Sequence, residues 1–236
     1  MRKSLIPKEL PEKFQQTNIS IYPPCGGYSE GRVMVSLLGE IELQYHHNMM
    51  GCAGMWGYLD TDFNEVIPPQ YIYAMNFING QAIVCKGEWD IKEIDGSKKY
   101  WCDNERWGVI DIDGKEIVPY IFDELYNVDG SDELFFVHCD GWKNGYFAIF
   151  NLTLQKIILK LDFDFDIGYM FNECFVDENN FLIFMKHLPG KETDYIYVYD
   201  LNKEKYIVYN QKNTERTLHG EKKIVINSDG EDIVVF

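Results

Sequence analysis

Short apolar runs, interrupted every few residues by Asp, Asn, Gly or Pro, occupy most of the chain. In two places a run closes on an aspartate, Asp60 or Asp111, and an aliphatic pair follows six and seven residues later, Val66–Ile67 or Ile117–Val118. Asp and Gly favour tight turns, and short runs with turn residues at this spacing are typical of β-hairpins. No long segment has a helical period. The pattern predicts an all-β protein.

These two hairpins belong to an internal repeat. The segments 55–71 (MWGYLDTDFNEVIPPQY) and 106–122 (RWGVIDIDGKEIVPYIF) share Trp-Gly, the aspartate, the aliphatic pair and a proline. Weaker copies keep the frame around Asn151 and Asp200, and a last one lies at Asn227. Periods of about 40 to 50 residues fit blade-like or solenoid β units. We expect one domain, 1–236, with units at roughly 17–54, 55–105, 106–144, 145–194 and 195–236.

Each residue type that the two units share has a physical role. The aspartate caps its own turn, as a β-turn and not as a calcium loop, because Asp60-Thr-Asp62 lacks the later EF-hand ligands. Gly57 and Gly108 allow a neighbouring backbone or ring to lie close. Proline has no N–H for the ladder and is expected to end the returning strand. The structural anchors are therefore Trp56, Gly57, Asp60, Trp107, Gly108 and Asp111.

The ordered motif Trp56-Gly-Tyr-Leu-Asp, Val66-Ile-Pro-Pro-x-Tyr71, Phe77-x-x-Gly80-x-Ala-x-Val84 resembles the WG-repeat (KWG-type) proteins of bacteria. The resemblance is tight over 55–84 and 106–123, recognisable over 21–35 and weak beyond 145, where Trp-Gly is lost. It implies tandem β-hairpins and no established catalytic role. Two arrays are compatible: a closed, small propeller-like array, in which terminal half-units share a blade, or an open, curved solenoid-like stack.

The charge is strongly negative and uneven. The 22 Lys and Arg against 38 Asp and Glu give −16, and residues 103–200 alone hold 20 acids and 7 bases, or −13. This excludes nucleic acid as a partner, because phosphate contacts need surplus cations. Asp162, Asp164 and Asp166 alternate with phenylalanines, so on a strand they would share one face. That face is either solvated, bound to a cation or in contact with a basic partner.

Catalytic and cofactor motifs are absent from the sequence. There is no GxSxG, HExxH, P-loop or GxGxxG, and the histidines and cysteines have no metal-ligand spacing. We predict no enzyme, no cofactor and no metal. No apolar run is long enough to span a membrane, and no export signal is visible, which favours a cytoplasmic protein. Outside the repeat frame, Trp89 and Trp101 lie in an inserted stretch, 86–105, as possible contact residues.

The expected function is non-catalytic binding of a protein partner. One concrete form is an acidic immunity or inhibitor protein that neutralises a basic toxin with its acidic face. The alternative is a glycan-binding or glycan-processing protein that uses the rim aromatics and carboxylates. The sequence favours a partner without naming it, and it leaves the oligomeric state open.

Overall fold

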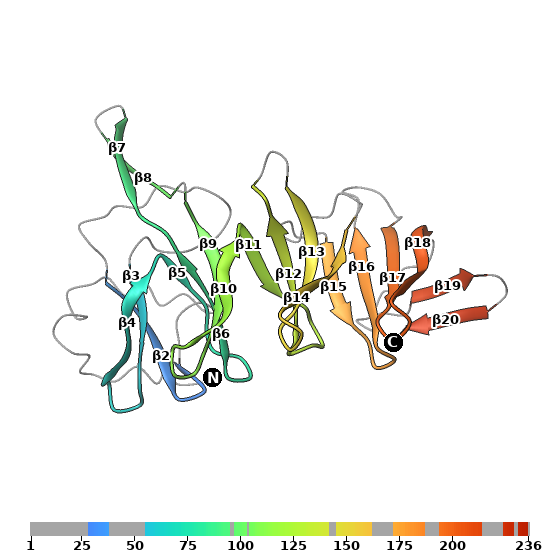
Figure 1. Cartoon of the computed structure of the whole chain (residues 1–236), viewed down its shortest axis with the longest axis horizontal. Coiled ribbons are helices and arrows are strands. Elements are labelled where there is room, and N and C mark those ends of the chain that lie inside the picture. Colours follow the sequence, from blue (N-terminus) through green and yellow to red (C-terminus); the bar gives the residue numbers. More distant parts are fainter. Residues whose placement is uncertain are drawn as a thin grey trace, which may run out of the picture. The chain divides into compact units, whose positions relative to one another are not determined.

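The structure is a computed structural model that describes residues 28–37, 55–94, 97–102, 104–141, 145–161, 172–186, 194–213, 224–228 and 231–235. These residues form twenty β-strands, β1 to β20, and no helix (Figure 1). The all-β prediction is confirmed for them. Four antiparallel sheets of four strands and two hairpins account for every strand.

The first two sheets contain the Trp-Gly motifs. The first has the order β1-β2-β3-β4, with bounds Tyr28–Ser29, Arg32–Leu37, Met55–Leu59 and Glu65–Tyr71. The second has the order β10-β9-β6-β5, with β5 at Tyr73–Ala74, β6 at Gln81–Lys86, β9 at Arg106–Asp111 and β10 at Glu116–Phe122. Between β6 and β9 the chain forms a separate hairpin of β7 (Asp90–Ile94) and β8 (Ser97–Trp101).

The third and fourth sheets repeat this plan without Trp-Gly. The third is β11-β12-β13-β14, at Glu124–Asn127, Leu134–Cys139, Tyr146–Asn151 and Lys156–Lys160. The fourth is β15-β16-β17-β18, at Asn172–Val176, Phe181–Lys186, Asp194–Asp200 and Lys205–Asn213. The hairpin expected near the C-terminus is present as β19 (Ile224–Ser228) and β20 (Glu231–Val235).

Contacts divide the chain into two compact units, one within Met1–Leu125 and Val137–Gly145, the other within Tyr126–Phe136 and Tyr146–Phe236. In the first unit, the core gathers around Tyr58, Tyr71, Phe77 and Ile110. In the second, buried aliphatic and aromatic side chains such as Phe136, Ile149 and Phe184 form the core. In both units the core comes from alternate positions of neighbouring strands, as period-two side-chain alternation requires.

The boundaries of the sheets differ from the boundaries of the sequence repeats. The Trp-Gly strand β3 pairs on one side with β4 of its own repeat and on the other with β2, which precedes that repeat. Likewise β9 lies between β10 and β6. Each of these sheets therefore joins the end of one repeat to the start of the next. That connection makes neighbouring repeats depend on each other for hydrogen bonds.

The prediction that proline ends the returning strand is wrong. Strand β4 continues through Pro68 and Pro69 to Tyr71, and β10 continues through Pro119 to Phe122. The ladder tolerates proline here because the strand bulges at these residues, as the register shifts against β3 and β9 show. A bulge leaves residues without a ladder hydrogen bond, so the missing N–H has no cost there.

Glycine makes this bulge possible. A Cβ atom built on Gly57 would lie 2.5 Å from the carbonyl oxygen of Ile67 and 2.6 Å from the nitrogen of Pro69. At Gly108 the same atom would lie 2.6 Å from the carbonyl oxygen of Val118 and 2.8 Å from the ring of Tyr120. Real Cβ atoms do not approach backbone so closely. The glycine of Trp-Gly thus leaves room for the backbone of the returning strand in both sheets, and at Gly108 also for the ring of Tyr120.

Candidate binding surfaces

The turn after the third strand of each four-stranded sheet is held by one side chain. Asp60 Oδ1 accepts hydrogen bonds from the backbone N–H groups of Asp62 (2.8 Å) and Asn64 (2.9 Å). Asp111 Oδ1 accepts from Asp113 (3.1 Å) and Lys115 (2.8 Å). The backbone closes the same turns, with the N–H of Asp60 on the carbonyl of Asn64 and that of Asp111 on Lys115. These are capped β-turns of the kind the sequence predicts.

The two weak repeats have the corresponding caps. Asn151 Oδ1 accepts from the N–H of Leu154 (2.8 Å), and Asp200 Oδ1 accepts from Asn202 (2.9 Å) and Lys203 (3.0 Å). A further capped turn at Asp177, between β15 and β16, has the same hydrogen bonds, from Asn179 and Phe181. This turn was not predicted, because no aliphatic pair follows Asp177 at the repeat spacing.

These turns collect on one edge in the first unit. In a meander of four strands the first and third turns lie at the same end of the sheet. Two contacts then join the two sheets at that end. The Glu30 carboxylate accepts from the N–H groups of Asn79 and Gly80, both at 2.7 Å. The Arg32 guanidinium donates to the carbonyl of Ile112 at 2.9 and 3.1 Å. We call this end of each unit the turn edge.

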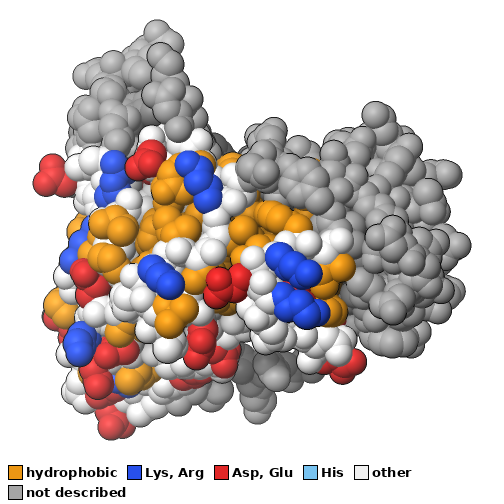
Figure 2. Space-filling model, turned by 45° about the vertical axis from the view of Figure 1, so that its right-hand side comes forward, with side chains coloured by type: hydrophobic (Ala, Val, Ile, Leu, Met, Phe, Trp, Pro, Cys, Tyr) orange, Lys and Arg blue, Asp and Glu red, His pale blue; other side chains and the backbone are white. Residues whose placement is uncertain are grey.

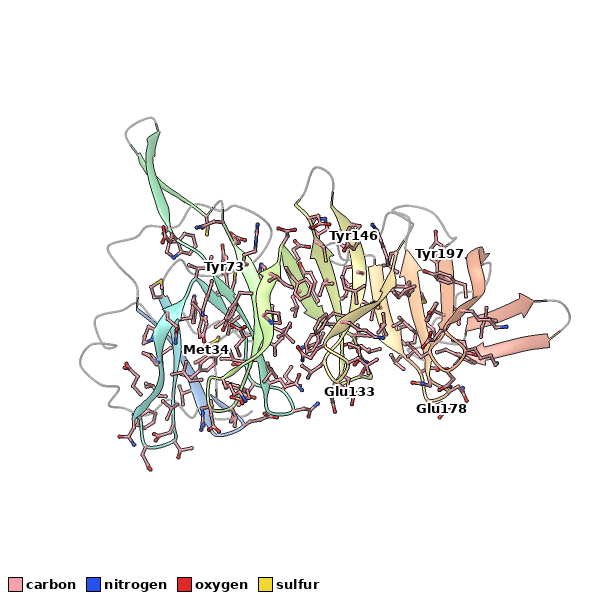
Figure 3. The ribbon with its side chains drawn as sticks, viewed as in Figure 1. Met34, Tyr73, Glu133, Tyr146, Glu178 and Tyr197 are labelled. Atoms are coloured by element: carbon pink, nitrogen blue, oxygen red, sulfur yellow. The ribbon has the colours of Figure 1, made fainter. Side chains whose placement is uncertain are left out.

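The second unit has a corresponding turn edge. The N–H of Val176 donates to the carbonyl of Asp129 (2.7 Å), which ties the β11–β12 turn to β15 of the next sheet. Asn180 Nδ2 donates to Asn202 Oδ1 (2.9 Å), joining the two turns of the fourth sheet. Glu133 and Glu178 mark two of these turns at the same end of the unit (Figure 3).

Carboxylates predominate on both turn edges. In the first unit, the described turns and the strand starts beside them carry two bases, Arg32 and Lys115, and seven acids: Glu30, Asp60, Asp62, Glu65, Asp111, Asp113 and Glu116. In the second unit, the corresponding positions carry three bases, Lys156, Lys203 and Lys205, and seven acids: Asp129, Asp132, Glu133, Asp177, Glu178, Asp200 and Glu204. In the left part of Figure 2, red side chains gather toward the lower end of the described surface. Only Asp60, Asp111, Asp177 and Asp200 among these carboxylates cap their own turns, so most of the excess of acid comes from other turn and strand-start residues.

Two of the capping carboxylates titrate below their usual range. Hydrogen bonds from the side chain and then the backbone of Asn64 lower the pKa of Asp60. Asp200 is desolvated, which by itself would raise its pKa, but hydrogen bonds and the charge of Lys203 outweigh this and lower the pKa. The Lys203 ammonium lies 3.0 Å from Asp200 Oδ2. Both carboxylates are therefore anions at neutral pH, but Asp200 is only 1% exposed and its charge is matched by Lys203.

A second candidate surface lies at the base of the β7–β8 hairpin, at the other end of β6 and β9. The ring of Tyr73 stacks on Trp107, with centroids 5.7 Å apart and planes 6° from parallel. It meets Trp89 nearly edge-on, at 5.8 Å and 69°. Trp107 is 2% exposed, whereas Tyr73 and Trp89 are only partly buried. We call Tyr73, Trp89 and Trp107 the aromatic cluster (Figure 3 labels Tyr73).

The negative charge of Glu105 acts on groups of the aromatic cluster and beside it. Burial and then the negative charge of Glu105 raise the pKa of Tyr73, and the same two causes raise the pKa of Cys85. The nearby cations Lys86 and Arg106 are cross-strand partners, displaced by one residue from Cys85 and Trp107, and so face the other side of the sheet. There Lys86 Nζ lies 4.0 Å from the ring centroid of Tyr120.

A buried carboxylate organises the segment beyond β12. Asp123, 8% exposed, accepts from Arg106 (3.0 Å) through Oδ1 and from the N–H of Gly141 (2.7 Å) through Oδ2. His138 Nδ1 lies 3.8 Å from Asp123 Oδ2, which is too long for a hydrogen bond. Both carboxylate oxygens already have other donors, so this group fixes the backbone of the 139–141 segment.

The predicted site residues have different outcomes. The structure places Asp60 and Asp111 in capped turns, Gly57 and Gly108 against bulges, and the buried Trp107 in the aromatic cluster, while Trp56 is partly buried. Trp89 joins that cluster, and Trp101 ends β8. Asp162, Asp164 and Asp166 lie outside the described residues. The gathering of turn carboxylates at one edge was not predicted, although the Asp-x-Asp and Asp-Gly turns were its signal.

Two negative observations complete the description. Among the described residues no group of three or more His, Cys, Asp or Glu side chains is arranged to hold a metal ion. The same part of the chain contains no helix that could cross a membrane.

The fold and the capped turns define a protein of tandem four-stranded antiparallel sheets. The family model for the WG containing repeat matches residues 56–88 and 107–141. The resemblance to WG-repeat proteins is thereby confirmed in these two segments, and the chain carries at least two WG repeats. No curated protein and no solved structure matches the chain.

Proposed function

We propose that this chain is a non-catalytic binding protein that recognises a basic protein partner through its turn edges. The observation that supports the proposal is the gathering of carboxylates at the turn edge of each unit. A field of one sign at a surface attracts an oppositely charged partner and speeds its association. The concrete form that we favour is an acidic inhibitor or immunity protein acting in the cytoplasm against a basic toxin.

The array of repeats is part of this proposal. We favour a closed, small propeller-like array over an open, curved stack, because closure would cover the terminal strand edges that otherwise invite strand addition. Small-angle scattering discriminates between the two. A closed array of 236 residues should have a radius of gyration close to the value of about 18 Å for a compact chain of this length. A clearly larger radius would favour the open stack.

The proposal is tested by capture from the native host at low and high salt, with identification of the eluted proteins. A basic protein released by salt is the expected result, because screening weakens contacts between exposed charges. Binding that salt leaves unchanged would contradict the proposal. So would the absence of any basic protein among those captured.

Matched variants then locate the contact. Asp132→Asn with Glu133→Gln removes two negative charges from the turn edge of the second unit. Gln70→Lys with Ile121→Lys changes the net charge by the same amount at exposed positions near the ends of β4 and β10 that lie opposite the turn edge. Only the first pair should slow association with the captured partner. Equal effects of both pairs would mean that net charge, and not the turn edge, controls binding.

A glycan-binding function is the second candidate, favoured by a partly buried Trp89 in contact with Tyr73, whose hydroxyl is affected by the charge of Glu105. An aromatic face and a carboxylate are the usual components of a sugar site. Its hydrolytic form would need two carboxyl groups about 5 to 9 Å apart on either side of the sugar. Saturable binding of an oligosaccharide, lost in Trp89→Leu, would support this candidate over the first.

A further inference from the structure

We infer that the Asn79–Gly80 turn is a site of covalent modification, at which water converts Asn79 to aspartate or isoaspartate, and that Glu30 controls the rate. The turn lies between β5 and β6, at the turn edge of the first unit, where the Glu30 carboxylate binds it. The inference is independent of the proposed function, because it needs no partner and concerns the chain's own peptide bond.

The reaction is a hydrolysis that passes through a cyclic imide. The backbone nitrogen of Gly80, after losing its proton to a base of the solvent, attacks the side-chain amide carbon of Asn79. The bond from that carbon to the side-chain nitrogen breaks, and the nitrogen takes up a proton and leaves as ammonia. Water then opens one of the two carbonyl–nitrogen bonds of the imide, which gives aspartate or isoaspartate. No group is oxidised or reduced, and water is the co-reactant.

The shape of the turn leaves the reacting atoms uncrowded. Asn79 is exposed and has a φ of +53°, and Gly80 follows it with a φ of +76°. No atom lies within 4 Å of the position that a Cβ atom of Gly80 would occupy. Glycine itself has no side chain to shield its nitrogen. Steric crowding therefore does not protect this peptide bond.

The Glu30 carboxylate opposes the reaction. Its Oε1 accepts the N–H of Asn79 and its Oε2 accepts the N–H of Gly80, both at 2.7 Å. The proton that the Gly80 nitrogen must lose is thus held in a hydrogen bond to a carboxylate, and a negative charge beside that nitrogen disfavours the amide anion. Ring closure also requires the nitrogen to turn toward the Asn79 side chain. Modification therefore needs the turn to open from Glu30.

A second turn of the first unit has the same arrangement. Asp140 and Gly141 have φ values of +66° and +77°, and the N–H of Gly141 donates to Asp123 Oδ2 at 2.7 Å. An Asp–Gly pair can form the same imide, with loss of water in place of ammonia. In both turns a carboxylate from another part of the chain holds the glycine N–H. The tertiary contact, and not the local sequence, is what controls the rate at such a turn.

Modification changes the contact between the first two sheets. Either product adds a negative charge to the residue whose N–H binds Glu30, and like charges at short range repel. Isoaspartate also inserts a methylene group into the backbone of the turn. Both changes weaken the pair of hydrogen bonds from Asn79 and Gly80 to Glu30, and both add one carboxylate to the turn edge.

The test measures the rate of modification in the full chain at neutral pH. Incubation in heavy-oxygen water labels each carboxyl group that forms, and peptide mapping by mass spectrometry gives the labelled fraction at Asn79. We expect the folded chain to react at least about tenfold more slowly than the chain unfolded in guanidinium chloride. Tenfold corresponds to about 1.4 kcal/mol, close to the contribution of one hydrogen bond to a charged group. Equal rates in the folded and unfolded chain would overturn the inference.

Two variants and a matched control identify the protecting group. Glu30→Ala should raise the rate at Asn79 in the folded chain at least about tenfold. Glu30→Gln, whose amide oxygen can still accept one N–H, should give an intermediate rate. Ser29→Ala is the control, because it removes the bond from Ser29 Oγ to the carbonyl of Phe77, between the same two sheets, and leaves Glu30 in place. It should react as slowly as the unmodified chain.

Two outcomes of these variants would contradict the inference. An unchanged rate in Glu30→Ala would mean that the carboxylate does not protect the turn. Equal acceleration in Ser29→Ala would assign the protection to the contact between the sheets in general. Circular dichroism of each variant shows that the comparison is made on folded chains, and neither outcome alters the salt-sensitive capture that tests the proposed function.

Discussion

The second sheet and the third sheet have the same strand order along the chain but differ at one position. In the second sheet Trp107 pairs with Phe122 and Val109 with Val118, so two steps along β9 span four residues of β10. In the third sheet Phe147 and Ala148 replace Trp and Gly, Ala148 pairs with Lys160 and Ile149 with Leu159, one residue for one. Where the glycine is present the returning strand has two extra residues opposite it, and where it is alanine the pairing at that position is one for one. A one-residue shift nearer the turn, such as that between Ile149 and Phe150, is common to both sheets.

This difference shows what the Trp-Gly pair does. The first sheet has the bulge as well, since Trp56 pairs with Tyr71 and Tyr58 with Ile67. The extra residues include Pro68 and Pro69 in β4 and Pro119 in β10. A regular ladder would not accept these prolines, because proline has no N–H to donate. The motif is therefore a device for folding an edge strand tightly over its neighbour. Four predictions test that comparison, from the largest expected effect to the smallest.

The largest effect is expected for Gly108→Ala. The new methyl group would meet the backbone of Val118 at 2.6 Å, which cannot move without disrupting the bulge. We expect a loss of about 3 kcal/mol in the free energy of unfolding, measured by urea denaturation. Ala148→Gly, the reverse change in the third sheet, should cost only about 1–2 kcal/mol from lost packing and added chain entropy.

Gly80→Ala is the control for the glycine prediction. Gly80 has a φ of +76°, but no atom lies within 4 Å of its Cβ position. Alanine there should cost about 1–2 kcal/mol from backbone strain alone. If Gly108→Ala destabilises no more than Gly80→Ala, close approach of the bulge is not the reason for the glycine.

Tyr58→Phe should have the next largest effect. Tyr58 is 1% exposed, and its hydroxyl donates to the carbonyl of Met75 at 2.7 Å. Removing the hydroxyl leaves that carbonyl without this donor, at a cost of about 1–2 kcal/mol in urea denaturation. Val109 occupies the corresponding position of the second sheet without such a bond. An unchanged stability would mean that the Met75 carbonyl finds another donor.

The turn caps should give a smaller and graded effect. Asp111 Oδ1 accepts from two backbone N–H groups, those of Asp113 and Lys115, whereas Asn151 Oδ1 accepts from that of Leu154. Asp111→Ala should therefore cost about 1 kcal/mol and Asn151→Ala about half of that in thermal or urea unfolding. Asp111→Asn, which keeps the acceptor oxygen, should be close to the unmodified chain. A larger cost at Asn151 would reverse the comparison between strong and weak repeats.

The smallest effect concerns pH. Because the pKa of Asp60 is lower in the folded protein than its ordinary value of 3.8, its ionised form favours folding above that value, and this contribution is lost as the pH falls through the folded pKa. The stability difference between the chain and Asp60→Asn should therefore shrink steadily below about pH 4. Chemical unfolding from pH 6 to pH 2.5 measures it. A difference that is constant over this range would contradict the assignment.

Local signals made much of the fold predictable. The capped turns at Asp60 and Asp111, the weak copies at Asn151 and Asp200, and the C-terminal hairpin all follow from turn residues placed between short apolar runs. Such features depend on neighbours a few residues away. The strand ends at proline were predicted wrongly, because the bulge that accommodates Pro119 depends on Gly108, eleven positions earlier, lying on the adjacent strand.

The candidate surfaces were only partly predictable. Trp89 was identified from its place outside the repeat frame, but its edge-on contact with Tyr73 depends on the pairing of β5 with the end of β6. The acidic edge was attributed to Asp162, Asp164 and Asp166 and to the middle of the chain. Those three aspartates lie outside the described residues, so that prediction stays a prediction. The described residues place further carboxylates at the turns of both units, because antiparallel strands return alternate turns to the same end.

The sequence by itself determined that this is an acidic, all-β chain of WG-type hairpins with capped turns, since each of those features is set by residue type and short spacing. The tertiary structure decided how repeats share sheets, which glycines lie against backbone, and which carboxylates and rings become neighbours. Those outcomes depend on pairs such as Glu30 with Gly80 and Tyr73 with Trp107, which are 50 and 34 positions apart. No local pattern encodes such distances, because they are fixed only when the core packs.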